Sequence, residues 1–251
     1  MPRKKKKDSF LLPILAAAIF AAGFVAFYVS TSKTATDPVT GCALQTDNLG
    51  SALTILLDST EPYSAVQLKQ VSNRIVSEVE SLRPLDRVRI YTVGDASEKL
   101  LAPYFDYCKP DPNANESPIL SRFKLANFTF MLEENLEKMQ GSRSNSPIIS
   151  SLGSVAADLP GAYEDRRIIL VSDLIENSEI ISMYPSDWRA TAERDKRNIA
   201  AKRPMLSGIY LEILFIPRPD QPQQDVALRD WWWSFIQDSG GSVARFTPIS
   251  G

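Results

Sequence analysis

The sequence predicts an α/β domain in which a doubly wound, mainly parallel sheet carries helices on both faces, behind one N-terminal transmembrane helix. First, short apolar runs of strand length alternate with longer segments whose apolar residues recur at helical spacing. Strands joined by helices need crossover connections, which favour a parallel sheet. Second, a basic run near the N-terminus is followed by a long stretch without charge. Third, 251 residues suffice for one full-sized domain and an appendage.

The N-terminus has the pattern of a single-pass membrane anchor. Residues 10–29 are twenty consecutive uncharged residues, enough to cross about 30 Å of hydrocarbon as a helix. By the positive-inside rule, the preceding Arg-Lys run stays in the cytoplasm and the bulk of the chain is periplasmic or extracellular. A cleaved signal peptide is the alternative, because residues 30–32 are small. The expected parts are a cytoplasmic tail, a transmembrane helix in the inner or plasma membrane, a polar linker and the α/β domain, at residues 1–9, 10–30, 31–50 and 51–251.

The first half of the domain begins with a short apolar run at residues 52–57, typical of a strand buried on both faces. Apolar residues at helical spacing predict a helix over 64–82, which ends before Arg83-Pro84. The alternating, β-branched run at 86–93 predicts a second strand, and 99–104 is a weaker candidate. Residues 106–118 are rich in Pro and Asn and are expected to form a loop.

The second half continues the alternation. Periodic apolar residues predict helices at residues 120–139, 148–159, 188–202 and 226–238. Apolar, β-branched runs predict strands at residues 166–172, 209–216 and 242–246, of which the first is the clearest central strand.

The two cysteines are expected to form one disulfide, Cys42–Cys108, if the domain is exported, because compartments outside the cytoplasm are oxidising. The closed loop of about 65 residues corresponds to a few kcal/mol of stabilisation in the chain-entropy model. Two free thiols are the alternative.

Composition excludes several classes of protein. The chain has no histidine, which removes Ser-His-Asp and Cys-His catalysis and histidine-based zinc sites. Two cysteines cannot supply the four ligands of a structural zinc site. Beyond the N-terminal 31 residues, acidic side chains outnumber basic ones, so we expect no nucleic-acid partner.

Two predicted strands end in aspartate. Ligands of parallel sheets bind at the carboxyl ends of the strands, so Asp58 and Asp173 mark the expected site. The run Asp58-Ser59-Thr60, the later Ser144-Asn145-Ser146 and then Asp173 resemble the von Willebrand factor A family. The resemblance covers roughly residues 50–248 and includes the closing helix, Gly240-Gly241 and a short strand.

The resemblance implies a metal-ion-dependent adhesion site, built in that family from an Asp-x-Ser-x-Ser run, a separate Thr and a separate Asp. The second hydroxyl position falls on Pro62, which has no ligand atom, so the site is degenerate relative to the family. An all-oxygen set suits a hard cation such as Mg²⁺ or Mn²⁺. Capping of strand ends by the two aspartates is the alternative. The implied ligands are Asp58, Thr60, Ser144 and Asp173, with Ser64 and Ser146 as further candidates.

These observations together predict a membrane-anchored binding module that recruits a protein partner, with or without a divalent cation. Partner contacts are expected at Glu61, Asn145 and Leu174. No nucleophile–base pair is apparent, so we expect no enzyme. The alternatives are a structural subunit of an envelope or secretion/transfer assembly without metal dependence, and a Mg²⁺-dependent phosphohydrolase with Asp58 as nucleophile. Residues 231–233, three tryptophans, form either an aromatic binding patch or helix packing.

Overall fold

The structure is a computed structural model, and it divides into two compact units, Met1–Ala35 and Thr36–Gly251. Apart from residues 19–21, which are helical, the predicted anchor at 10–30 lies outside the described residues, as does the tail at 1–9. Within the described part of the chain, no helix is both long and apolar enough to cross a bilayer. The described residues are 19–21, 35–44, 49–94, 102–111, 117–138, 141 and 145–250.

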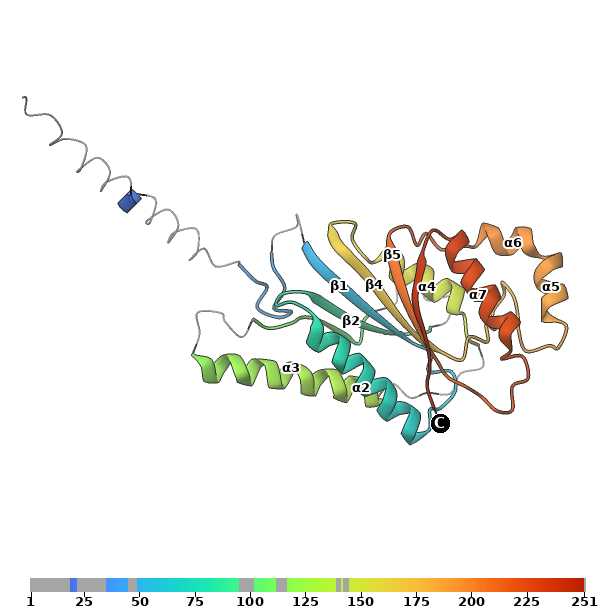
Figure 1. Cartoon of the computed structure of the whole chain (residues 1–251), viewed down its shortest axis with the longest axis horizontal. Coiled ribbons are helices and arrows are strands. Elements are labelled where there is room, and N and C mark those ends of the chain that lie inside the picture. The colour runs from blue at the N-terminus through green and yellow to red at the C-terminus, as the bar shows by residue number, and fades with distance from the viewer. Residues whose placement is uncertain are drawn as a thin grey trace, which may run out of the picture. The chain divides into compact units, whose positions relative to one another are not determined.

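The second unit is built on one six-stranded sheet with the order β3-β2-β1-β4-β5-β6 (Figure 1). Neighbouring strands are parallel except β2 and β3, which are antiparallel. This is the order of a doubly wound sheet. The chain adds strands outward from β1 to one edge, and then from β4 to the other edge, so the topological switch point lies between β1 and β4. The predicted mainly parallel α/β fold is therefore confirmed. The strands are β1 Leu49–Leu57, β2 Arg87–Thr92, β3 Phe105–Cys108, β4 Tyr163–Ser172, β5 Ile209–Phe215 and β6 Ser242–Pro248.

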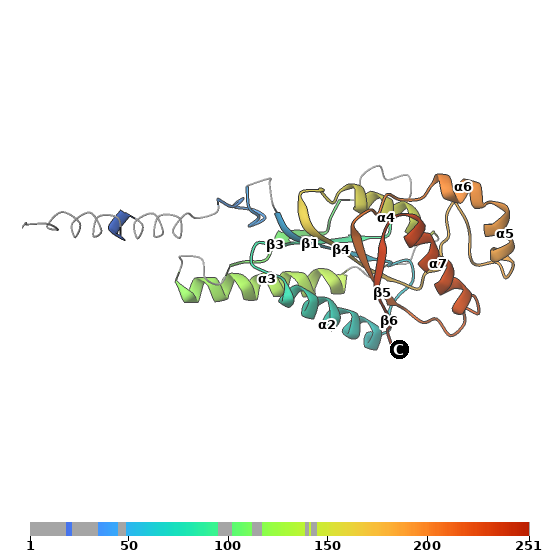
Figure 2. The ribbon, with the colours of Figure 1, turned by 45° about the horizontal axis from the view of Figure 1, so that its top comes forward.

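Helices cover both faces of the sheet (Figure 2). Successive side chains of a strand point to opposite faces, so β1 contributes Leu53 and Ile55 to one core and Ala52 and Leu56 to the other. The first core lies under α2 and α3, and the second under α4, α5, α6 and α7. The helices are α2 Ala65–Ser81, α3 Pro118–Lys138, α4 Ile148–Ala157, α5 Trp188–Arg194, α6 Lys196–Ala201 and α7 Val226–Asp238.

Local sequence explains where the helices begin. Ser64 caps α2: its hydroxyl accepts from the Gln67 backbone N–H at 3.2 Å, while the Gln67 side chain accepts from the Ser64 N–H at 3.0 Å. Asp225 caps α7 by accepting from the Leu228 N–H at 3.0 Å. Both caps lie at the carboxyl edge of the sheet, where the chain turns from strand to helix, and they fix the loops there.

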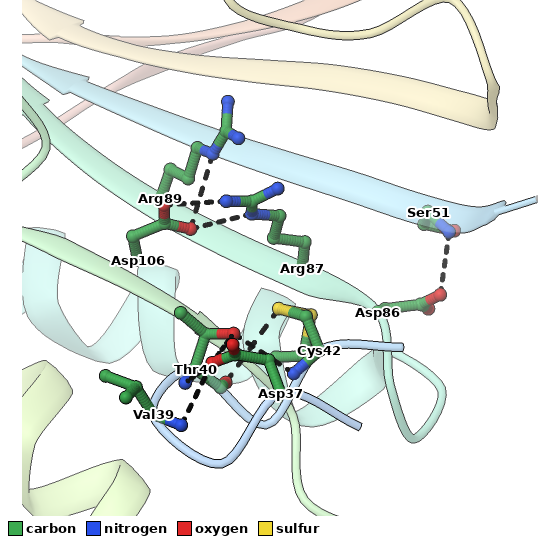
Figure 3. Close-up of a disulfide and its surroundings, with 10 residues drawn as sticks. Asp37, Val39, Thr40, Cys42, Ser51, Asp86, Arg87, Arg89 and Asp106 are labelled. Atoms are coloured by element: carbon green, nitrogen blue, oxygen red, sulfur yellow. Dashed lines mark hydrogen bonds and ion pairs between the residues drawn. A yellow bond between two sulfur atoms is a disulfide. The ribbon is translucent and has the colours of Figure 1, made fainter. Parts of the chain in front are cut away.

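Three sequence predictions differ from the structure in detail. The loop expected at 106–118 contains part of β3, because Phe105 and Cys108 are buried and the strand pairs with β2. Its polar member, Asp106, lies between Arg87 and Arg89, with Nε–Oδ1 distances of 2.7 and 3.3 Å (Figure 3). In the weaker strand candidate, residues 99–101 lie outside the described residues and 102–104 are not in a strand. The helix expected at 188–202 is interrupted at Asp195 and forms α5 and α6.

The predicted disulfide is present between Cys42 and Cys108 and joins the start of the domain to the end of β3 (Figure 3). The Cys108 N–H also donates to the Thr40 carbonyl at 2.9 Å. Asp37 orders the turn by accepting from the N–H groups of Val39 and Thr40 at 2.9 and 2.8 Å. Residues 36–44, expected as linker, are thus fastened to the edge strand β3, and such coverage protects an edge from pairing with other chains.

We expect the double substitution Cys42→Ser and Cys108→Ser to lower the free energy of unfolding by about 3 kcal/mol, because the bond closes a loop with a sequence separation of 66 residues. Urea unfolding of the purified protein measures this loss. Reductant should destabilise the wild type equally and leave the double variant unchanged. Equal urea midpoints for oxidised wild type and double variant would contradict the prediction.

Candidate functional site

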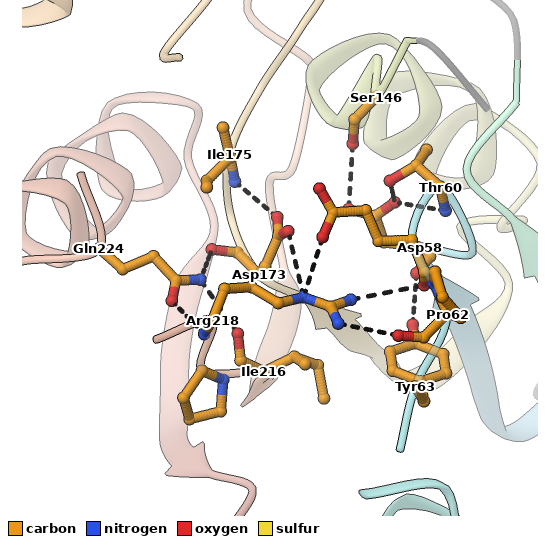
Figure 4. A network of polar contacts seen from close by, with 12 residues as sticks. Asp58, Thr60, Pro62, Tyr63, Ser146, Asp173, Ile175, Ile216, Arg218 and Gln224 are labelled. Atoms are coloured by element: carbon orange, nitrogen blue, oxygen red, sulfur yellow. Dashed lines mark hydrogen bonds and ion pairs between the residues drawn. The ribbon is translucent and has the colours of Figure 1, made fainter. Parts of the chain in front are cut away.

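The candidate site lies where the loops after β1 and β4 meet the segment before α4, with the Asp58 carboxylate at its centre (Figure 4). Its Oδ1 accepts from the Thr60 hydroxyl at 2.7 Å and from the Thr60 N–H at 3.3 Å. Its Oδ2 accepts from the hydroxyls of Ser146 and Ser172 at 3.0 and 2.7 Å. The carboxylate is buried, so these four donors replace the water it loses on folding.

Asp173, the second strand-end aspartate, closes a turn. Its Oδ1 accepts from the Ile175 N–H at 2.9 Å, and Leu174 between them has a positive φ of 64°. Burial raises the pKa of Asp173 to about 7, and repulsion from Asp58 and Glu61 adds to the rise. The carboxyl therefore lies in a region with an excess of negative charge.

Arg218 supplies the positive charge of the site. It follows β5, and its Nε lies 3.3 Å from Glu61 Oε2 and 3.7 Å from Asp173 Oδ2. Its terminal N–H groups donate to the carbonyls of Pro62 at 2.8 Å and Glu61 at 3.4 Å (Figure 4). The guanidinium carbon lies 5.9 Å from the centre of the Tyr63 ring. Arg218 thus joins the loop after β1 to the loop after β4.

Arg218 was not among the predicted site residues, because only the loops that begin with an aspartate were expected to form the site. The available pattern was a basic residue just after the predicted strand 209–216, whose carboxyl end lies at the same edge. Gln224 fixes this third loop: its side-chain amide donates to the carbonyls of Asp173 and Ile216 at 2.8 and 3.0 Å, and its oxygen accepts from the Arg218 N–H.

The structure brings Asp58, Thr60 and Ser146 together by direct hydrogen bonds. Ser144 lies outside the described residues. Ser64 serves as the N-cap of α2.

The expected partner contacts differ in exposure. The side chain of Glu61 is 32% exposed and its carboxylate also accepts from the Tyr184 hydroxyl at 3.2 Å. Asn145 is exposed. Leu174, by contrast, is fully buried in the core beneath α7, so its side chain is not available to a partner.

The arrangement offers a divalent cation few free ligands. In the part of the chain that the structure describes, no three acidic, cysteine or histidine side chains are grouped to hold a metal ion. The Asp58 oxygens already accept four hydrogen bonds, and Arg218 lies beside Asp173. The hydroxyl oxygens of Thr60 and Ser146 keep lone pairs, because each hydroxyl donates its proton to Asp58. A cation bound there would compete with Arg218 for Asp173.

A buried carboxyl that the sequence did not single out lies beside this network. Glu176 is fully buried, and its Oε2 accepts from the Ile149 N–H at 2.9 Å. Because Pro147 at the N-cap makes no side-chain bond, Glu176 caps α4 from a distant segment. The backbones of Ser146 and Asn177 pair in both directions at 3.0 Å, which holds the two segments together. Burial raises the pKa of Glu176 to about 8.

The three consecutive tryptophans of α7 pack in different ways. Trp232 is fully buried and its ring N–H donates to the Leu174 carbonyl at 2.8 Å. Trp231 stacks on Phe235 with ring centres 5.0 Å apart. Trp233 is 39% exposed. Trp231 and Trp232 therefore pack α7 against the domain, which is the second of the two interpretations of this run.

The solved structures to which this chain is similar include two of low sequence identity. The first is a von Willebrand factor type A protein from Catenulispora acidiphila, with 11% identity, a TM-score of 0.41, and coverage of 81% of this chain and 39% of that one. The second is the human COPII-coat protein Sec24c, with 13% identity, a TM-score of 0.40, and coverage of 81% and 30%. This chain thus spans less than half the length of either structure. Neither a protein-family model nor a curated protein sequence matches it.

We expect Glu176→Gln to flatten the pH dependence of stability. The wild-type carboxyl has a pKa of about 8 in the folded state and 4.5 ordinarily, so the unfolded chain ionises first as pH rises. The contribution of Glu176 to the free energy of unfolding is fully present below pH 4.5. It then falls by about 1.4 kcal/mol per pH unit up to pH 8. The uncharged amide of the variant has no such loss, so the variant gains stability relative to wild type between pH 5 and 8.

Urea unfolding across this pH range measures the difference. Glu179→Gln, a change on the same segment at an exposed position, should keep the wild-type pH dependence. Parallel pH profiles for wild type and Glu176→Gln would contradict the assignment.

Proposed function

We propose that this chain is a membrane-anchored binding domain that recruits a protein partner through the loops at the carboxyl edge of its sheet. The observation that carries the proposal is the convergence of two distant segments on Asp58, through Ser146 and Ser172, beside Thr60 of its own loop. This network gives the loops around it a fixed shape, which lowers the entropic cost of binding. The resemblance to the von Willebrand factor A family supports the same function.

The charges of the edge indicate the chemistry of the partner. Three acids, Asp58, Glu61 and Asp173, lie at this edge, and among the described residues Arg218 pairs with two of them, Glu61 and Asp173. Of these acids, Glu61 is the most exposed, and Asn145 lies exposed next to Ser146. We propose that Glu61 and Asn145 contact a basic segment of the partner. Charge complementarity of this kind guides association and selects partners.

We also propose that the domain lies outside the cytoplasm, on the periplasmic or extracellular side of the inner or plasma membrane. The uncharged stretch at 10–29 and the basic run before it support an anchor of this orientation. The Cys42–Cys108 disulfide supports an oxidising compartment, because such bonds are rare in the cytosol.

A constitutive structural subunit without metal dependence is the second candidate. The observation that favours it is the position of Arg218, whose guanidinium already neutralises part of the charge on Glu61 and Asp173. A phosphohydrolase with Asp58 as nucleophile has no such support, because this carboxylate is buried and bonded through both oxygens. Binding of Mg²⁺ or Mn²⁺ stays a prediction, and in our proposal it requires Arg218 to turn away.

We expect Glu61→Arg combined with Asn145→Ala to reduce partner capture at least about tenfold, since a like charge at a contact repels a basic segment. Capture is measured by mass spectrometry of proteins that co-purify with the tagged full chain from native membranes. Glu164→Arg is the matched control, because Glu164 is exposed near the start of β4, at the opposite edge of the sheet. If the double variant captures the partner as well as the wild type does and the control variant loses capture, the binding surface lies elsewhere on the domain.

Arg218→Gln should raise the affinity for Mn²⁺ by about tenfold or more, because it removes a positive charge next to Asp173 and Glu61. Calorimetric titration of wild type and variant tests this, with Arg229→Gln as the control on α7. The second candidate function predicts that EDTA leaves partner capture by the wild type unchanged. Tight Mn²⁺ binding by wild type and weaker binding by Arg218→Gln would contradict the role given to Arg218.

A further inference from the structure

The first half of α3 carries an apolar surface that the domain does not use for packing. Ile119, Phe123, Ala126 and Phe130 recur at helical spacing, and the three large members are 82, 68 and 62% exposed in chain order. The opposite side of the helix is buried through Phe128 and residues of the next two turns. Figures 1 and 2 show this half of α3 projecting beyond α2, and no other helix of the described chain covers it. Large exposed apolar surfaces of this kind mark interaction sites.

The charged side chains of α3 before Glu133 are of one sign. Residues 118–132 contain two basic side chains, Arg122 and Lys124, and no acidic one. Both are exposed. Aromatic and aliphatic side chains next to cations are the composition of helices that lie in the interface of a bilayer with anionic lipids. The next acid along the helix is Glu133, which lines a shallow hollow with Arg122 and Phe130. Asp37, which caps its own turn, and Asp111 lie at the hollow on the other side.

The start of the domain lies against the same part of α3. A hollow of about 440 Å³ is lined on one side by residues 36–41 and on the other by Phe123, Asn127 and Phe128. Val39, 74% exposed, belongs to this lining as well. The Cys42–Cys108 disulfide fastens residues 36–44 in this place. The point where the chain enters the domain is therefore next to Phe123.

The length of chain before this point limits how far α3 can be from a membrane. The proposed anchor ends at residue 30, and five residues, 31–35, precede the domain. Fully extended, they span at most about 18 Å. Because the entry point is fixed next to Phe123, the apolar surface of α3 stays within reach of the headgroup region.

We propose that this surface, Ile119, Leu120, Phe123 and Phe130 with Arg122 and Lys124, contacts anionic lipid and holds the domain against the bilayer. The inference rests on the proposed membrane anchor. It gives the domain a preferred orientation in which α3 faces the lipid. A second copy of the chain and a protein partner are the competing occupants.

The test uses the full chain in vesicles of phosphatidylcholine with about one-third phosphatidylglycerol, the anionic component that such surfaces require. Phe123→Cys carries an environment-sensitive fluorophore, attached without reductant so that the native disulfide stays closed. Met205→Cys is the matched control, because Met205 is 86% exposed and follows α6, which packs on the other core from α3. We expect the Phe123 label to shift to shorter wavelength and to be quenched by doxyl-labelled lipid, and the Met205 label to show neither change.

Adding Ile119→Ser and Phe130→Ser to the Phe123-labelled chain should lower the quenching at least about twofold, because the apolar contact is lost. Replacing phosphatidylglycerol by phosphatidylcholine should weaken it as well. If the chain resists alkaline extraction but its Phe123 label is not quenched, the proposed lipid contact is wrong and the proposed anchor is retained. A chain released by alkali would overturn the anchor and the inference with it. A spectral shift in detergent that grows with protein concentration would assign the surface to a second copy.

Discussion

The carboxylate of Asp58 determines how the edge of this sheet is built. A buried anion requires hydrogen-bond donors, and those donors come from the loop after β1, the end of β4 and the segment before α4. Ser146 is held in turn by backbone pairing with Asn177, which places Glu176 at the start of α4. One buried charge therefore joins its own loop to two segments that lie 88 and 114 residues further along the chain.

Arg218 adds a second level to this organisation. Its guanidinium contacts both Glu61 and Asp173, so the loops after β1, β4 and β5 are joined by charge as well as by hydroxyl groups. Removing one partner of such a buried group leaves the other without compensation, which costs more than the pair itself contributes. The edge is consequently a preformed surface whose charges are partly balanced from within, and in our proposal the remaining negative charge faces the partner.

The sequence predicted the large periodic elements well, because their apolar residues follow the burial of a sheet covered on both faces. The helix over 226–238 coincides with α7, and the strand at 52–57 lies within β1. It failed at β3, since a four-residue strand whose Asp106 binds two arginines has no apolar pattern to detect. Within the site, Asp58 was predictable from its place at a strand end, and Thr60 from the resemblance to the von Willebrand factor A family. The place of Arg218 just after a predicted strand was visible, but its contacts were not predictable, because they depend on tertiary packing between residues more than 150 apart.

The position of the disulfide has a consequence for the order of folding. If the domain is exported as we propose, with its N-terminal end first, Cys42 crosses first and Cys108 crosses when less than half of the residues have followed. By then β1, α2, β2 and β3 are all available, and they are neighbours in space as well as in sequence. The bond can close around this half-sheet before β4 arrives, so the exposed flank of β1 becomes a ready template on which the remaining parallel strands add in turn.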